Sequence, residues 1–277
     1  MQHMSNPIHL DNRVVLCVDG ADSATFLNGL LTNTIVDLKN DQLGYGALLT
    51  PQGKIICDII LQRTETGFLL DVPIQADEAL LKRLKMFKLK ANVEISLRDD
   101  LAVYAFVNDG LSDPRHPNMP KRMISEKGLY EDTSCKTYHV ERTKLGIAEQ
   151  GKDFGENEVF PADVNMDIND GIDFKKGCFI GQEVVSRMKR RGTARRRTLS
   201  FHFPNGAPQA GTPLEIEGKT IGEVSSSTSD YALAKLRIDR LAKAQSTGKP
   251  EITANGKKAE LISPNWLAEQ MEAVTSS

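Results

Sequence analysis

Short strand-like runs recur at regular intervals after about residue 195 of this 277-residue chain, and turn signals separate them. The clearest of these turn signals are dipeptides that suit tight hairpins: Asn205-Gly206, Glu217-Gly218 and Asn255-Gly256. Many short strands at even spacing are typical of a small β-barrel or sandwich. Only residues 239–244 indicate a short helix in this part. We therefore predict two domains, residues 1–192 and residues 193–277, of which the second is a small β-barrel.

Residues 1–192 mix strands and helices without strict alternation. Apolar and β-branched runs predict strands over residues 13–18, 45–50, 54–62, 68–72, 93–97, 101–107 and 137–142. Leucine and phenylalanine at helical spacing predict amphipathic helices that begin near residues 23 and 76. Residues 108–130 are expected to be rich in loops, because three prolines lie close together there. This order favours the α+β fold class over a doubly wound parallel sheet.

The composition is that of an ordinary globular protein. The chain has 35 basic and 37 acidic residues, a formal net charge of −2 and 40% hydrophobic residues, which argues against a protein that binds nucleic acid over its whole surface. No window approaches the roughly 18 uninterrupted apolar residues of a membrane helix. The first residues are polar and show no secretory signal. We therefore expect a cytoplasmic protein with no membrane partner.

The four cysteines are widely spaced and form no C-x-x-C pair, and the five histidines make no metal-ligand spacing with them. We predict no metal site. Cys17 and Cys57 lie in apolar runs, where a free cysteine is usually a buried small hydrophobic residue.

Cys178 stands in a different setting, between Gly177 and Gly181. Glycine lets the backbone turn sharply and approach a ligand closely. A helix that begins at Gln182 would place its N-terminal dipole near the thiol, and Lys176 lies just upstream, so both would favour a reactive, exposed thiolate. The alternative is a buried loop cysteine beside structural glycines.

A basic run with no acidic residue follows this cysteine: Arg187, Lys189, Arg190, Arg191, Arg195, Arg196 and Arg197. A solvated linker face is the default interpretation of such a run. A site for a polyanion such as a phosphate or polyglutamate is the second. Nucleic acid is an unlikely partner, because no aromatic residue in the run offers a platform for base stacking.

The sequence K-G-C-F-I-G-Q-E of residues 176–183, followed by Arg187, resembles the signature of YgfZ-type folate-binding proteins. These are relatives of the glycine-cleavage T-protein, an aminomethyltransferase, and include mitochondrial iron–sulfur assembly factors. Residues 26–33, the hairpin of residues 49–54 with Asp58, and residues 160–165 resemble further motifs of the family. The resemblance spans roughly residues 12–265.

The resemblance implies a T-protein-like α+β assembly around a central cavity, with a C-terminal β-barrel. It implies tetrahydrofolate as the cofactor, and a role in iron–sulfur cluster assembly or repair with client or assembly proteins as partners. The catalytic residues that it implies are Cys178, Lys176 and Asp58. The implied cofactor-binding residues are Asn33, Asp58, Arg142, Asn165, Gly177, Gly181, Gln182, Glu183 and Arg187.

One departure from the T-protein pattern concerns the run from Arg142 to Gly146. T-proteins carry an acidic residue in an R-x-E-x-G stretch that contacts the pterin, whereas Lys144 holds that position here. An ammonium group cannot accept the hydrogen bonds that a carboxylate accepts from the pterin. Two functions therefore stand: a folate-binding accessory protein in which Cys178 is the functional thiol, or a folate-dependent aminomethyl or one-carbon transferase. Enzymatic activity is left open.

Overall fold

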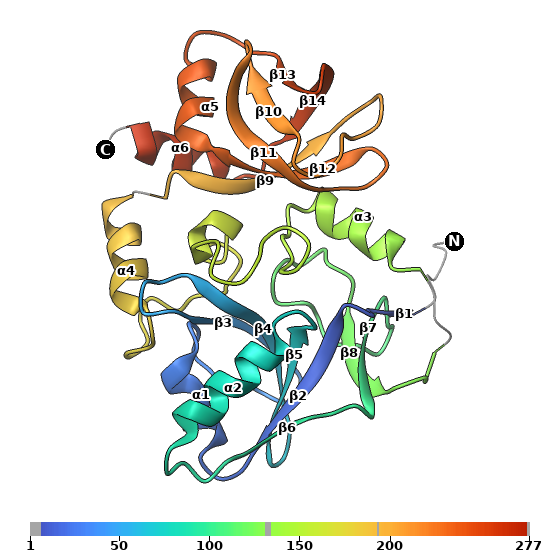
Figure 1. Cartoon of the computed structure of the whole chain (residues 1–277), viewed down its shortest axis with the longest axis vertical. Coiled ribbons are helices and arrows are strands. Elements are labelled where there is room, and N and C mark those ends of the chain that lie inside the picture. Colours follow the sequence, from blue (N-terminus) through green and yellow to red (C-terminus); the bar gives the residue numbers. More distant parts are fainter. Residues whose placement is uncertain (1–6, 131–133, 193, 276–277) are drawn as a thin grey trace.

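The computed structural model describes residues 7–130, 134–192 and 194–275. A five-stranded antiparallel sheet, in the order β3-β4-β5-β2-β6, forms the first layer (Figure 1). Its strands are β2 (Arg13–Asp19), β3 (Leu43–Leu49), β4 (Ile55–Arg63), β5 (Gly67–Pro73) and β6 (Glu94–Leu97). Helices α1 (Ser23–Leu30) and α2 (Asp77–Lys88) share one hydrophobic core with this sheet, to which Leu27, Leu80 and Leu84 contribute.

A second, three-stranded sheet has the order β1-β7-β8 and comprises β1 (Ile8–His9), β7 (Leu101–Ala105) and β8 (Arg122–Glu126). Three helical elements follow it along the chain: α3 (Lys136–Lys144), the 3₁₀ helix η1 (Pro161–Val164) and α4 (Gln182–Arg191). They lie between the sheets and the C-terminal part (Figure 1).

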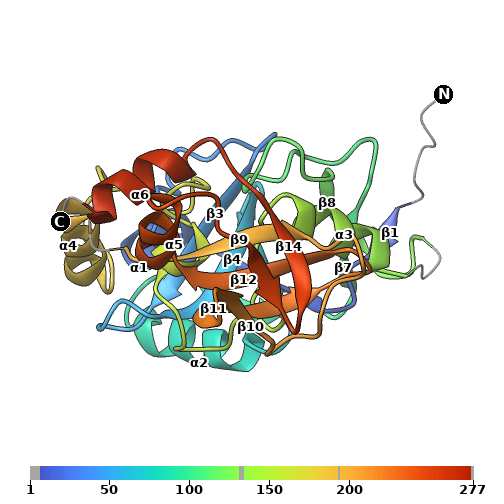
Figure 2. The ribbon, with the colours of Figure 1, turned by 90° about the horizontal axis from the view of Figure 1, so that it is seen from above.

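The C-terminal part is a closed six-stranded barrel in the order β10-β11-β12-β9-β14-β13. Its strands are β9 (Arg196–His202), β10 (Pro213–Ile216), β11 (Lys219–Ser227), β12 (Tyr231–Arg237), β13 (Ile252–Ala254) and β14 (Lys257–Ile262). Helices α5 (Ile238–Gln245) and α6 (Leu267–Thr275) lie together at one end of the barrel, beside α4 (Figures 1 and 2). The predicted α+β class and C-terminal barrel are confirmed. The exact boundary between residues 192 and 193 stays a prediction.

One local prediction is wrong. Residues 137–142, predicted as a strand, lie in helix α3, where Tyr138 and Arg142 stand one helical turn apart and are both buried. Packing of that face overrides the β-propensity of the segment. Residues 108–130 are rich in loops as predicted and contain one strand, β8, and helix α6 has no counterpart among the predicted elements. No helix among the described residues is long and apolar enough to span a membrane.

Candidate functional site

The loop that carries Cys178 ends at Gly181, where a left-handed residue begins helix α4. Gly181 has φ = +80°, and a Cβ at this position would lie 2.6 Å from the carbonyl oxygen of Thr50. The turn between β3 and β4 also touches α4, because a Cβ at Gly53 would lie 3.1 Å from Cβ of Val184. Two segments singled out by the resemblance, more than 120 residues apart, are thus in contact.

Lys176 fixes the other end of this loop. Its Nζ donates hydrogen bonds to the carbonyl oxygens of Asn28 and Leu31, both at 2.7 Å, and of Asn33, at 2.8 Å. Burial lowers the pKa of Lys176 to about 8, and Asp173 opposes this shift. The ammonium group therefore holds the loop to the end of α1, and its predicted influence on Cys178 stays a prediction.

Between these two anchors the Cys178 side chain is exposed, as the sequence predicted. Gly177 and Glu183 beside it are also exposed, and Gln182 is half-buried. Arg187 lies on the exposed face of α4. Cys17 and Cys57 are buried as predicted, and burial raises the pKa of both thiols, that of Cys17 to about 11.

Asp58 lies apart from this loop, in the interior. It is 1% exposed, and its Oδ1 stands 3.9 Å from Nη1 of Arg13. Neither of these two atoms has a hydrogen-bond partner within the described part of the chain. Burial raises the pKa of Asp58, while Arg13 and Arg115 oppose the rise. A buried carboxyl with a free oxygen is suited to a proton-transfer role if a substrate reaches it.

Arg142 belongs to the same buried polar interior. Its Nη1 donates to Oδ2 of Asp153 at 2.7 Å, and its Nε lies 3.6 Å from Oε2 of Glu149. Asp153 in turn accepts a hydrogen bond from Ser225 of the barrel, at 2.9 Å. Arg142 therefore joins the two parts of the molecule, a role that its motif position does not predict.

A buried cluster of charged residues surrounds Asp58 and Arg142, and sequence analysis did not predict it. Arg13 pairs with Asp71, and Asp71 also pairs with Arg122. Asp113 pairs with Arg115 and Arg122, and the charges of these two arginines hold the pKa of Asp113 at about 2 although burial opposes this. A charged residue inside an apolar strand, such as Asp71, is the one local signal of this cluster.

A cavity of about 430 Å³ lies between the N-terminal part and the barrel. Its wall includes Asn165, whose Nδ2 donates to the carbonyl oxygen of Thr198 at 2.7 Å and whose Oδ1 is buried with no partner among the described residues. Arg115 and Lys144 also line it. The predicted folate residues Asn33, Asp58 and Arg142 are not among its lining residues, and Asn33 instead donates to the carbonyl oxygen of Tyr45.

The volume of this cavity and the polar groups on its wall are compatible with tetrahydrofolate. Pockets of about 300–1,000 Å³ hold ligands of that class. Lys144 can pair with a glutamate carboxylate of a folate, and Nη1 of Arg115, the one side-chain nitrogen of this residue without a partner among the described residues, can donate to a second carboxylate. The free Oδ1 of Asn165 can accept from an N–H of the ring. No acidic residue is among the described lining residues. Lys144 pairs with Glu141 at 3.2 Å.

Comparisons with known proteins agree on the C-terminal domain and on the relatives. Residues 195–269 match the family model of the CAF17 C-terminal β-barrel domain. The chain is 30% identical over 249 residues to the mitochondrial iron–sulfur cluster assembly factor IBA57 homologue of Neurospora crassa, covering 75% of this chain and 57% of that protein. It is 27% identical over 278 residues to human mitochondrial IBA57, covering 84% of this chain and 77% of that protein.

The fold also matches a solved structure. The glycine cleavage system aminomethyltransferase T of Bartonella henselae aligns with a TM-score of 0.71 at 17% sequence identity, over 95% of this chain and 86% of that one. The chain therefore has the T-protein fold. The resemblance to YgfZ-type proteins fits these findings.

The cytoplasmic location predicted from the sequence is contradicted. The assembly factors of Neurospora crassa, Pyricularia oryzae and human are all named as mitochondrial. A polar first segment was an insufficient basis for the predicted location. No group of three or more metal-ligating side chains is placed to hold a metal ion among the described residues.

Proposed function

Because the C-terminal domain of this chain is the barrel of the CAF17 family and the chain is homologous to IBA57 assembly factors, we propose that the protein supports iron–sulfur cluster assembly or repair. It acts as a tetrahydrofolate-binding accessory protein, and Cys178 is its functional thiol. The observation that carries the proposal is an exposed cysteine on a loop whose two ends are fixed by Lys176 and Gly181.

The chemistry of the thiol supports this role. A thiolate is a soft ligand that suits iron and sulfur species. Only Cys178 of the four cysteines is exposed, so a cluster that contacts it must take its other ligands from a partner protein or from a small thiol. The iron–sulfur client or assembly protein is therefore the partner that completes the site.

Tetrahydrofolate binds in the cavity between the two parts of the molecule. Arg115 and Lys144 hold its glutamate tail, and Asn165 accepts a hydrogen bond from its ring. When bound, tetrahydrofolate supplies a carrier of one-carbon units. The chain itself supplies the positive charge and the walls of the cavity.

A folate-dependent aminomethyl or one-carbon transferase is the second candidate. The free Oδ1 of buried Asp58 favours it, because a carboxyl group with an unpartnered oxygen can serve in general acid–base catalysis. Conversion of tetrahydrofolate to a one-carbon folate in the presence of aminomethyl or methyl donors would establish this activity. Folate binding without turnover favours the accessory role.

The test of the proposed function replaces Cys178 by Ala in cells that lack the protein. We expect no recovery of iron–sulfur enzyme activity, because the exposed sulfur ligand is lost. Cys135→Ala is the matched control, since Cys135 is half-buried and its Sγ already donates to the carbonyl oxygen of His9 at 3.0 Å. Full recovery with Cys178→Ala, at the protein level of the control, contradicts the role of this thiol.

A further inference from the structure

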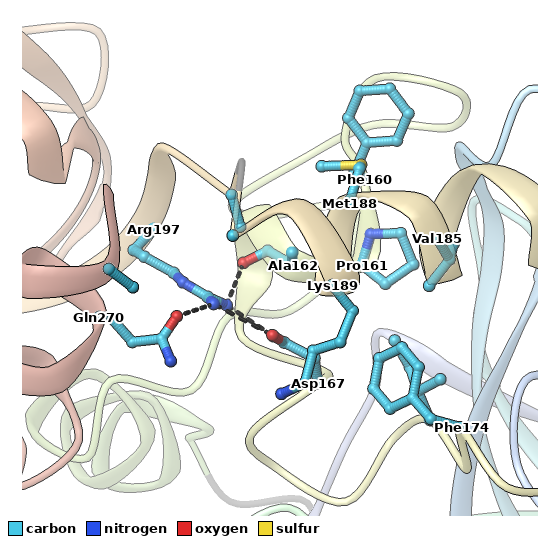
Figure 3. Close-up of a pocket in the computed structure, with 14 residues that line it drawn as sticks. Phe160, Pro161, Ala162, Asp167, Phe174, Val185, Met188, Lys189, Arg197 and Gln270 are labelled. Carbon is cyan, nitrogen blue, oxygen red and sulfur yellow. Dashed lines mark hydrogen bonds and ion pairs between the residues drawn. The ribbon is translucent and has the colours of Figure 1, made fainter. Parts of the chain in front are cut away.

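A second cavity, of about 200 Å³, lies between α4 and the end of the barrel that carries α6 (Figure 3). It shares no lining residue with the larger cavity that we assign to folate. Apolar side chains form most of its wall: Phe160, Pro161, Phe174, Val185 and Met188. Aromatic and thioether groups of this kind favour a flat apolar ligand.

One end of this cavity is polar and charged. Arg197, which is 1% exposed, donates to both carboxylate oxygens of Asp167, at 2.5 and 3.0 Å, and to Oε1 of Gln270 at 2.7 Å. It also donates to the carbonyl oxygen of Ala162 at 2.8 Å, and Figure 3 shows the hydrogen bonds from its guanidinium group to all three partners. The Nε of Arg197 is buried and has no hydrogen-bond partner within the described part of the chain.

A buried guanidinium N–H without an acceptor is costly, and a ligand oxygen can supply the missing acceptor. The charges at the wall also favour an anion. Asp167 balances Arg197, and Lys189, which also lines the cavity, adds one positive charge in excess. Lys189 Nζ lies 5.4 Å from the centre of the Phe174 ring, so this charge stands beside the apolar wall.

We propose that this cavity binds a small, single-ring aromatic carboxylate. The ring lies among Phe174, Val185 and Met188, and a carboxylate oxygen accepts the hydrogen bond from Nε of Arg197. The volume suits one ring with a short substituent, since a dry apolar cavity of about 150 Å³ already holds benzene.

Binding at this site would act on the helix that follows Cys178. Val185 is the one buried side chain of α4, and it is part of the cavity wall. A ligand in the cavity would contact Val185 and so add apolar contacts to a helix that buries few apolar side chains. We therefore expect amide hydrogen exchange in α4 to slow when the cavity is filled.

The test titrates the full-length protein with 4-methylbenzoate. Trp266 is the single tryptophan, and its ring lies 5.8 Å from the Arg197 guanidinium carbon, so its fluorescence reports events at this residue. Ala273→Leu fills the cavity from the exposed surface of α6, and Ala268→Leu is the matched control outside the lining. We expect a saturable signal that Ala273→Leu weakens by about tenfold or more and Ala268→Leu changes by less than about twofold.

Two further probes test the polar end of the cavity. Toluene lacks the acceptor and benzylamine carries the wrong charge, so both should bind more weakly than 4-methylbenzoate. The proposal is overturned if the folded wild-type protein gives no saturable signal, or if Ala273→Leu binds as tightly as Ala268→Leu. It is also overturned if tetrahydrofolate competes with 4-methylbenzoate, since the acid then occupies the larger cavity.

Discussion

His139 lies on α3 with its ring largely covered, beside two charges of opposite sign. Nε of Arg142 donates to its Nδ1 at 3.0 Å, and Oε2 of Glu149 stands 3.8 Å from the same atom. A ring nitrogen that accepts from a guanidinium has no room for its own proton. Burial and the Arg142 charge therefore lower the pKa of His139 to about 4.

This residue should make stability depend on pH in a mildly acidic range. Between pH 4 and the ordinary pKa of 6.5, the unfolded chain binds a proton at His139 that the folded chain does not. The free energy of unfolding should therefore rise with pH across this window, by at most about 1.4 kcal/mol per pH unit for one proton. His139→Gln should flatten that rise, which urea unfolding at a series of pH values measures. An equal slope in wild type and variant would show that His139 does not contribute.

Other buried polar pairs escape sequence analysis because their two members are far apart along the chain. Arg13 and Asp71 are 58 residues apart, and Asp153 and Ser225 are 72 apart. No local pattern connects them. Cys178 was easier to single out, because its two glycines and the helix that follows are its immediate neighbours in the sequence.

The loop before α4 shows how one residue determines where an element begins. Gly181 adopts a left-handed conformation and packs against the carbonyl of Thr50, so any side chain there is strained and collides with backbone. At Gly177, four residues earlier in the same motif, an added Cβ would have no other atom within 4 Å. The two glycines look equivalent in the sequence motif. In the structure, only Gly181 stands at a position that excludes a side chain.

We therefore expect Gly181→Ala and Gly177→Ala to differ. Gly181→Ala should destabilise the protein by about 1–3 kcal/mol and shift the start of α4, because of its left-handed backbone and the close contact with Thr50. Gly177→Ala should change the unfolding free energy by less than about 0.5 kcal/mol, as exposed surface changes usually do. Thermal unfolding of both variants measures the difference. Equal stability of the two variants would contradict the assigned role of Gly181.

Helices and strands were predicted well where a periodic pattern of apolar residues determines the secondary structure. They were predicted poorly where packing against distant parts of the chain determines it. The strands of the five-stranded sheet and the helix α2 follow such patterns. Helix α3 does not, since its sequence between Thr137 and Arg142 favours a strand until Tyr138 and Arg142 are buried by the rest of the fold. The structure thus shows where long-range contacts overrule local preference.

At the scale of the whole molecule, the barrel and the N-terminal part are joined by polar contacts at several places along their interface. Asn165 donates a hydrogen bond to the carbonyl oxygen of Thr198, Arg197 donates to Asp167, and Ser225 donates to Asp153. A ligand site at such a junction is built from residues that no single motif contains. This is why Asn165 is the one predicted folate residue that lines the cavity, while Arg115 and Lys144 were not predicted to bind folate.

Titration with tetrahydrofolate by calorimetry tests this placement of the folate site. Lys144→Ala should weaken binding by about three- to tenfold, as loss of a partly exposed charge pair would. Lys136→Ala, at an exposed position of the same helix, should leave the affinity unchanged. Asp58→Asn should also leave it unchanged, because Asp58 does not line the cavity. Absence of binding to the wild-type protein would disprove the folate proposal, and loss of binding only in Asp58→Asn would move the site.

The uneven exposure of the four cysteines has a practical consequence. Cys17 and Cys57 are buried, Cys135 is half-buried, and Cys178 alone is exposed. A thiol-reactive fluorophore or spin label added to the native protein should therefore attach at one place, directly before α4. Cys178 is thus a natural labelling position. A partner that binds the loop before α4 should change the signal of the label directly.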